Sequence, residues 1–531
     1  MNKLAIFLLV LGMYSCTKTD FSKVSYGKWN PNLAVPIGSV DFNMDEILSN
    51  HDNNELVVID QFGQLEVNYS TRLQSVSAAE VLTLPAVNES VNLSMTDLGI
   101  PTIPVFNQTI NQSTTAQFAM TLPSGIELHD LILDDGDLAI NVSTALKHDV
   151  VLTVTFPDIY YQGNPVTRVL TANYLGSTPH GSSASVDLTN HLLDLTAGNT
   201  TVNQLRIAIG VQINGTGNEI VGNEDVSINF GLNNLKLNNA TGYFGQQSLA
   251  VSSDSILIKL FNNAQSGVAA LTNPKINFKF INSFGIPFQL AINDMKTINV
   301  ANGVEMNIVN SSLAAINIPS APSNADSSIT ILPEINATNT TNLNNLINNT
   351  PKYLSFDVNA TTNPNGNTGP LNFISKDSKL FVEASVALPL EGYAYDFNLK
   401  DTMAFNFSDV EDNIDFLLFR LISKNGFPVN LIANATVVDQ NYVPLFDLLS
   451  GDQELIGAAP VDANGKVNDV ANRIVDISVD KAKLLQFKQG KYVVLEVKVA
   501  TTQPQTTVVK FYNDYKLSLK LAMQAVLNQS L

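Results

Sequence analysis

Hydrophobic and polar residues alternate with a period of two in short runs along most of the chain. Clear runs lie at 55–67, 150–156, 204–213, 275–281, 492–500 and 516–525. This alternation is typical of β-strands with one buried face. Gly, Pro, Asn and Asp separate the runs, and the Asn464-Gly465 pair is one such turn. The pattern therefore predicts an all-β fold.

Helical spacing is rare by comparison. Short helices are predicted at 44–48, 188–195, 343–347 and 480–487, with Asp480 as the N-cap of the last. Asn-rich stretches at 338–350 and 359–369 are predicted to be loops or linkers.

The chain has 531 residues, which is enough for three or four domains at about 150 residues each. We predict several consecutive antiparallel β-sandwich modules with few short helices. Their expected ranges are an N-terminal β region of one or two modules at 36–248, a middle module at 249–400 and a C-terminal module at 401–531.

One internal similarity supports related modules. Segment 278–290 (FKFINSFGIPFQL) aligns without gaps to segment 419–431 (FRLISKNGFPVNL), at an offset of 141 residues. Each contains a strand, a Gly-x-Pro corner and a second strand. Recurrence at domain-sized spacing suggests two related β-sandwiches, and two ordinary hairpins are an equally open alternative.

The N-terminus carries a secretory signal. Lys3 is followed by an apolar run at 4–11 and then by Gly-Met-Tyr-Ser at 12–15 and Cys16, the only cysteine of the chain. This arrangement resembles the bacterial lipobox, which implies cleavage of residues 1–15 and acylation of Cys16. Two or three acyl chains make a stable anchor, so 16–35 would be a tether. The resemblance favours the outer membrane, because Thr17 stands where inner-membrane lipoproteins often carry Asp. Lys18 and Asp20 resemble the charged export signal of surface-displayed Bacteroidota lipoproteins, so the cell surface is preferred over the periplasmic face.

Segments 28–31 (KWNP), 388–392 (LPLEG) and 425–428 (NGFP) resemble uncharacterised β-rich lipoproteins of Bacteroidota. Segment 273–290 resembles the opening of the water-stress and late-embryogenesis-abundant type β-sandwich. These resemblances imply a fold and a location, and they imply no assigned activity.

Charge and motifs narrow the function. The net charge of −19 repels phosphate backbones, so nucleic acid is excluded as a partner. The chain has no HExxH, CxxC, P-loop or GxSxG motif. We therefore expect no catalytic residue and no enzyme. A hydrolase whose carboxylates meet only in the fold is the alternative.

Two candidate binding features remain. Asp134, Asp135 and Asp137 could supply oxygens to Ca²⁺, or form an acidic hairpin tip. Trp29, Tyr393 and Tyr395 could form a stacking platform for a ligand, or pack within a sheet. No other cofactor is expected.

The function expected from these observations is that of a lipid-anchored, non-catalytic envelope or surface lipoprotein with a binding or structural role. Its partners would be the membrane, through the lipid on Cys16, and a glycan or a protein. One alternative is a glycan-binding accessory lipoprotein of a polysaccharide uptake system. Another is a fimbrial or stalk subunit that exchanges strands.

Overall fold

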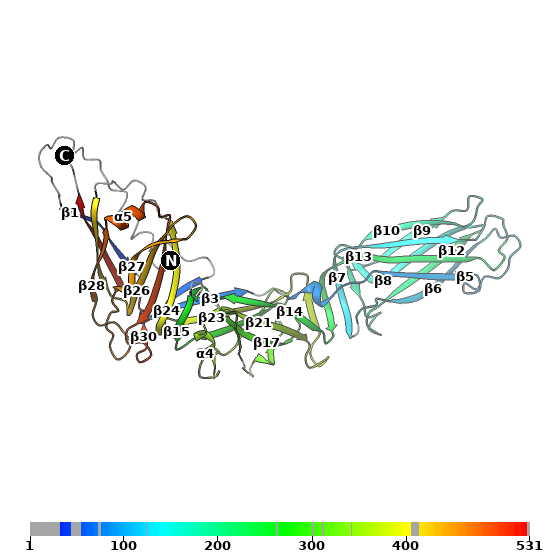
Figure 1. The fold of residues 1–531 in the computed structure, drawn as a ribbon. Helices are drawn as coiled ribbons and strands as arrows, with labels where there is room; N and C mark the ends of the chain where they lie inside the picture. The colour runs from blue at the N-terminus through cyan, green and yellow to red at the C-terminus, as the bar shows by residue number, and fades with distance from the viewer. Residues whose placement is uncertain are drawn as a thin grey trace.

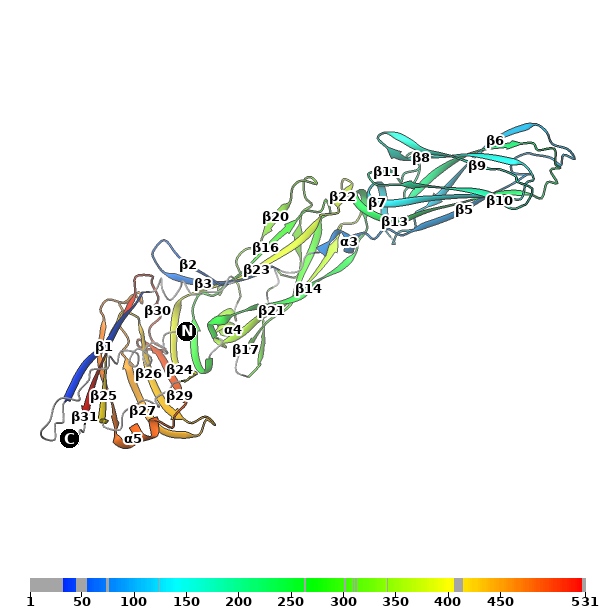
Figure 2. The same cartoon turned by 90° about the horizontal axis from the view of Figure 1, so that it is seen from above.

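A computed structural model describes residues 32–43, 55–72, 76–123, 125–261, 264–299, 302–308, 310, 313–340, 342–404 and 414–527. The prediction of an all-β protein with several antiparallel sheets and few short helices is confirmed. The strands form three bodies in a row, which we call proximal, middle and distal (Figures 1 and 2). The row bends where the proximal body meets the middle body.

The proximal body contains both ends of the described chain. Its first sheet has the order β1-β31-β25-β28, and its second has the order β15-β24-β29-β26-β27, with β30 beside β24. The elements are β1 (Asn32–Asn43), β15 (Ala264–Leu271), β24 (Glu391–Ala404), β25 (Ile414–Asn425), β26 (Val429–Val438), β27 (Pro444–Ile456), β28 (Ala471–Asp480), α5 (Lys481–Phe487), β29 (Tyr492–Thr501), β30 (Val509–Lys510) and β31 (Lys516–Leu527).

The middle body is also built from two sheets. Their orders are β2-β3-β23-β16-β20, with β4 beside β23, and β14-β21-β17-β18, with β19 beside β17. The elements are β2 (Glu55–Ile59), β3 (Leu65–Arg72), β4 (Val76–Ser77), β14 (Ser248–Leu257), η1 (Lys259–Phe261), β16 (Lys275–Asn282), β17 (Phe288–Asn299), β18 (Glu305–Asn307), β19 (Ile316–Ile318), β20 (Ser328–Ile331), α4 (Leu343–Asn348), β21 (Pro351–Thr362) and β23 (Lys379–Pro389).

The distal body has two four-stranded layers, β5-β13-β7-β10 and β6-β12-β8-β9, and the short strand β11 pairs with both β7 and β8. The returning strand β22 pairs with β13. The elements are α3 (Ala78–Val81) on the connection from the middle body and β5 (Val87–Ser94), β6 (Thr109–Ala119), β7 (Ile126–Thr144), β8 (Asp149–Tyr161), β9 (Asn164–Ala172), β10 (His180–Asp187), β11 (Leu192–Asp194), β12 (Gln204–Asn214), β13 (Asp225–Phe244) and β22 (Asn372–Ser375).

The sheets draw strands from both sides of the expected module boundaries. β1 and β15 lie in sheets of the proximal body, and β2 to β4 lie in the middle body. The chain thus starts in the proximal body, crosses the middle body, builds the distal body and returns. That the ranges expected from the sequence fold as independent units stays a prediction.

The middle and proximal bodies share one topology. β3-β23-β16-β20 corresponds to β1-β31-β25-β28, and β14-β21-β17-β18 corresponds to β24-β29-β26-β27. The corresponding strands follow one another in the same order from β14 and β24 onward, and α4 and α5 occupy corresponding places. The two aligned segments form the β16–β17 and β25–β26 corners. The similarity seen at the corners therefore extends over two whole sandwiches.

Two local predictions need correction. Segment 188–195 contains β11 and not a helix, because its backbone pairs with β7 and β8 and Asn190 takes a left-handed φ of 60°. Segment 55–67 is a hairpin and not one strand, since Gly63, with φ of 83°, closes a turn between β2 and β3. The predicted helices at 343–347 and 480–487 are confirmed, and Asp480 accepts a hydrogen bond from the Lys483 N–H. The helix predicted at 44–48 lies outside the described residues.

Candidate functional site

The predicted anchor lies just beyond the described residues. Cys16 and Trp29 both precede Asn32, where β1 begins. β1 pairs with β31 along its length, with Asn32 opposite Val526 and Asn43 opposite Lys516. Lys516 follows Phe511 and Asn513, whose backbones bond to the middle body. The Asn43 end of β1 therefore faces the middle body, and the Asn32 end points away from it. Figure 1 shows β1 in the proximal body.

Tyr393 and Tyr395 lie side by side on β24, opposite Ala270 and Val268 of β15. Their ring centroids are 6.3 Å apart and the ring planes differ by 17°. Both side chains are half-buried. Two nearly parallel, partly exposed rings could stack against a flat apolar face of a ligand, and they also stabilise the sheet as a same-face pair.

The three aspartates proposed for Ca²⁺ each have a different partner. Asp134 pairs with Lys376 at 2.6 Å, Asp135 pairs with Lys236 at 2.7 Å, and Asp137 accepts a hydrogen bond from Asn234 at 3.1 Å. The hydrogen bond from Lys236 lowers the pKa of Asp135. Within the described ranges, no group of three or more His, Cys, Asp or Glu side chains is placed to hold a metal ion.

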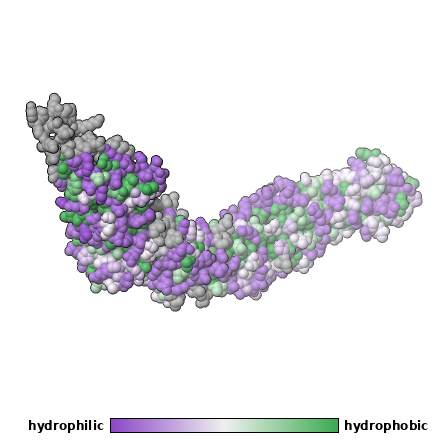
Figure 3. Space-filling view, in the orientation of Figure 1, coloured by the Kyte–Doolittle hydropathy of each residue, from purple (hydrophilic) through white to green (hydrophobic). Residues whose placement is uncertain are grey.

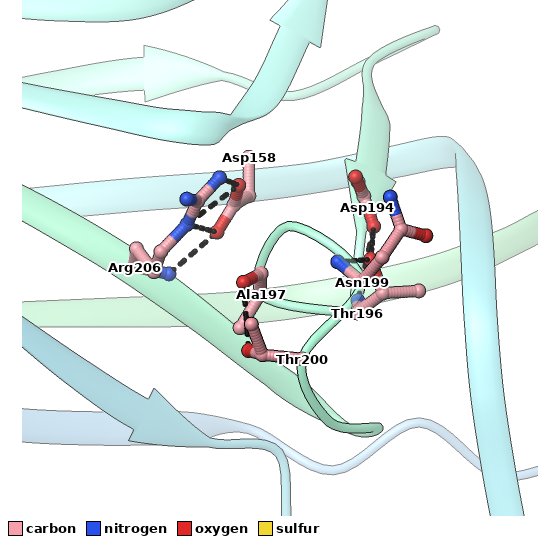
Figure 4. Close-up of polar contacts among 7 residues, drawn as sticks. All are labelled: Asp158, Asp194, Thr196, Ala197, Asn199, Thr200 and Arg206. Atoms are coloured by element: carbon pink, nitrogen blue, oxygen red, sulfur yellow. Dashed lines mark hydrogen bonds and ion pairs between the residues drawn. The ribbon is translucent and has the colours of Figure 1, made fainter.

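A buried ion pair, not predicted from the sequence, lies in the distal body (Figure 4). The Asp158 side chain on β8 is fully buried and accepts hydrogen bonds from the backbone N–H of Arg206 at 2.8 Å and from its Nε at 3.0 Å. This hydrogen bonding raises the pKa of Arg206. The sequence carries one indication of this pair, because Asp158 is a charged residue within a largely apolar strand. In the fold this position is buried, where a charged side chain needs a partner.

The loop after β11 packs onto this pair. Asp194 Oδ1 accepts hydrogen bonds from the N–H and the hydroxyl of Thr196, and residues 197–199 all take left-handed φ values. A Cβ added at Gly198 would lie 2.8 Å from Nη1 of Arg206. The guanidinium therefore supports the loop, and its Nε and Nη2 are already bonded to Asp158.

The free end of the distal body is formed by the loops at 95–108, 145–148, 173–179 and 215–224. Apolar side chains reach the surface there (Figure 3), including Leu175, which is 90% exposed, and Val105, which is 63% exposed. Beneath them, buried His148 links three loops: its Nδ1 accepts a hydrogen bond from the Thr216 N–H at 3.2 Å, and its ring meets Phe106 edge-on at 5.2 Å. Burial lowers the pKa of His148.

An open groove of about 450 Å³ lies on the proximal body between the 461–464 turn and the 503–510 segment. Its walls carry mostly polar side chains, among them Asp462, Gln503 and Lys510. The Asp462 carboxylate accepts hydrogen bonds from the N–H groups of Asn464 and Lys466 and so stabilises the 461–464 turn.

None of the helices in the described part of the chain is long and apolar enough to cross a membrane.

No family model matches this chain, and no curated protein matches its sequence. Among solved structures, it is similar to a Parabacteroides distasonis protein described as secreted, with a TM-score of 0.27 and 14% identity over 54% of this chain and 83% of that one. The infectious bursal disease virus VP2 particle gives a TM-score of 0.15 at 8% identity, covering 92% and 86%. The exported protein XepA of PBSX gives 0.14 at 8% identity, covering 64% and 99%. At these scores the likeness carries no argument about function.

Proposed function

We propose that this chain is a lipid-anchored, non-catalytic envelope protein that holds its distal body away from the membrane. The lipid on Cys16 would fix the outer end of the proximal body. The three bodies would supply the distance, and the loops at the free end of the distal body would meet the partner.

The position of β1 carries this proposal. Asn32, the first described residue after Cys16, lies at the outer end of the proximal body. The loops that contain Val105 and Leu175 lie at the opposite end of the molecule (Figure 2). An anchor attached near the middle body would instead bring the bodies alongside the membrane. The stretch from Cys16 to Asn32 can span at most roughly 55 Å when fully extended, so the proximal body would stay close to the lipid.

The first test compares the native chain with Cys16→Ala in the organism that produces it. We expect the native chain in the membrane fraction and the variant in the soluble fraction. An epitope tag inserted after Leu175, which is 90% exposed, reports on the free end. Removal of that tag by protease added to intact cells supports surface display, and protection supports the periplasmic face. Equal membrane retention of the native chain and Cys16→Ala would refute the lipid anchor.

A second candidate function is glycan binding, and the parallel rings of Tyr393 and Tyr395 favour it. Soluble β-glucan, xylan and mannan in affinity electrophoresis would test it. We expect any retardation of the native chain to be lost in Tyr393→Ala and Tyr395→Ala. Tyr161→Ala is a matched control, because Tyr161 is 47% exposed and stacks on His191 in the distal body. Equal retardation of all three variants would reject the platform.

A further inference from the structure

The fully buried apolar clusters do not continue from the middle body into the proximal body, although partly buried Ala269, Leu271 and Phe397 of the proximal strands pack against the middle cluster. The middle and distal bodies share a single connected cluster of buried apolar side chains, which runs from Val67 to Leu388. The proximal body has two clusters of its own. The middle and distal bodies thus form one unit, which we call the arm, and the bend in Figure 1 lies between the arm and the proximal body. The contacts at that bend decide how the arm is held.

Three chain segments meet at this joint through a closed ring of backbone hydrogen bonds. The Leu65 N–H donates to Phe511 O at 2.9 Å, the Phe511 N–H donates to Leu390 O at 2.9 Å, and the Leu390 N–H donates to Leu65 O at 2.8 Å. Leu65 begins β3, Leu390 links β23 to β24, and Phe511 directly follows β30. Each segment is thereby fixed to both of the others.

The residues next to this ring form a polar cluster around Glu391. The side chain of Glu391 is 8% exposed and accepts hydrogen bonds from Gln64 Nε2 at 3.1 Å and from the Thr272 hydroxyl at 2.8 Å. Asn273 Nδ2 also contacts the carboxylate, and Lys510 Nζ lies 3.5 Å from it. Burial opposes the charge of Glu391, but these hydrogen bonds and Lys510 outweigh it and lower its pKa.

We infer that the cluster around Glu391 locks the joint, so that the protein presents its distal body at one fixed angle to the proximal body. A buried carboxylate keeps its charge only while its partners surround it, and these partners come from different segments. Lys510 lies opposite Glu391 in the same proximal sheet, so opening the joint would leave that pair in place. It would instead remove Gln64, which lies in the turn between β2 and β3 of the middle body, from the Glu391 carboxylate. The inference concerns the joint alone and does not depend on acylation of Cys16.

Spin-label distances in the full chain test the lock. Cys16→Ala removes the only cysteine, so labels can be placed on exposed sites. Ser478→Cys with Ile331→Cys spans the joint, and Ile331→Cys with Leu175→Cys lies within the arm. We expect one narrow distance distribution for each pair. The change Glu391→Leu should broaden the distribution across the joint and leave the distribution within the arm unchanged.

Hydrogen exchange gives an independent readout. In Glu391→Leu the amides of Leu65, Leu390 and Phe511 should exchange roughly 10-fold faster or more, because buried partners of the carboxylate lose their hydrogen bonds. The matched control is Glu383→Gln, which removes a carboxylate charge from an ion pair with Lys279 in the middle body, where the side chain of Glu383 is 29% exposed. It should change neither readout.

Lys510→Met is the second variant if Glu391→Leu does not fold, because the Lys510 side chain is 32% exposed and its loss disturbs packing less. It should also broaden the distance across the joint. A broad distribution across the joint in the native chain would overturn the inference. So would a folded Glu391→Leu or Lys510→Met variant with unchanged distances and unchanged exchange.

Discussion

Removing the guanidinium of Arg206 should be one of the most damaging single changes in the distal body. In Arg206→Met the fully buried Asp158 carboxylate loses the hydrogen bonds from the guanidinium and keeps only the one from the backbone N–H of residue 206. Breaking a buried ion pair from one side costs about 3–5 kcal/mol. The Arg206 side chain is 39% exposed, so water can partly replace it, and we expect a loss of about 3 kcal/mol.

The assay must report on the distal body itself. Circular dichroism melting combined with hydrogen exchange of the peptide covering β12 does so. For a cooperative unit of 150–250 residues, about 3 kcal/mol corresponds to a Tm lower by roughly 6–12 °C.

The matched control is Arg420→Met. Arg420 makes an ion pair with Asp476 between β25 and β28, but both side chains are exposed, at 50% and 39%. Exposed pairs contribute about 0–1 kcal/mol, so this change should leave the Tm nearly unaltered. Equal losses for Arg206→Met and Arg420→Met, or a loss below about 1 kcal/mol for Arg206→Met, would refute the reasoning from burial.

Two further predictions concern buried polar side chains. Burial lowers the pKa of His148, so its contribution to the stability of the distal loops is present above the ordinary histidine pKa of about 6.5 and is lost as pH falls through the lower folded-state value. Hydrogen exchange of the 215–224 amides, corrected for intrinsic rates, should therefore become faster below pH 6.5. The increase should be smaller in His148→Gln. Asn282→Ala and Asn425→Ala should each lower the free energy of unfolding, measured by chemical denaturation, by about 1–3 kcal/mol, because each side-chain amide donates to at least two backbone carbonyls. A loss of stability in only one of the two variants would argue against equivalent corners.

The strands could be predicted from the sequence because alternation is a local property. β12 and β16 show it plainly, with every second residue buried. Their partners could not be predicted. The pairing of Asn32 with Val526, for example, joins residues at opposite ends of the chain, and no local pattern encodes such a contact. The missing partners explain why expected module ranges and observed sheets differ.

The candidate sites show the same contrast between local patterns, which the sequence reveals, and long-range partners, which it does not. Asp134, Asp135 and Asp137 are neighbours in the sequence, but in the fold Lys376 arrives from the returning chain and pairs with the first of them. Asp158 stands alone in the sequence, and its partner follows 48 residues later on β12. Sequence proximity therefore overstated the aspartate cluster, and it did not reveal that Asp158 pairs with Arg206. The parallel arrangement of Tyr393 and Tyr395 was accessible, because residues two apart share a face of a strand.

The corners explain why the middle and proximal bodies, which share one topology, resemble each other in sequence only over a short segment. A strand interior tolerates many apolar residues of suitable volume, so alternation persists while identity is lost. A corner is more demanding. Gly285 and Gly426 leave too little room for a Cβ, and their N–H groups donate to Phe373 O and Lys516 O. Each corner also buries an asparagine whose amide bonds backbone carbonyls, Asn282 in one and Asn425 in the other. In the alignment the two asparagines differ in position by two residues, a shift that preserves the face of a strand. The backbone carbonyls at the corner therefore accept hydrogen bonds in both bodies, although the residue-by-residue match is lost.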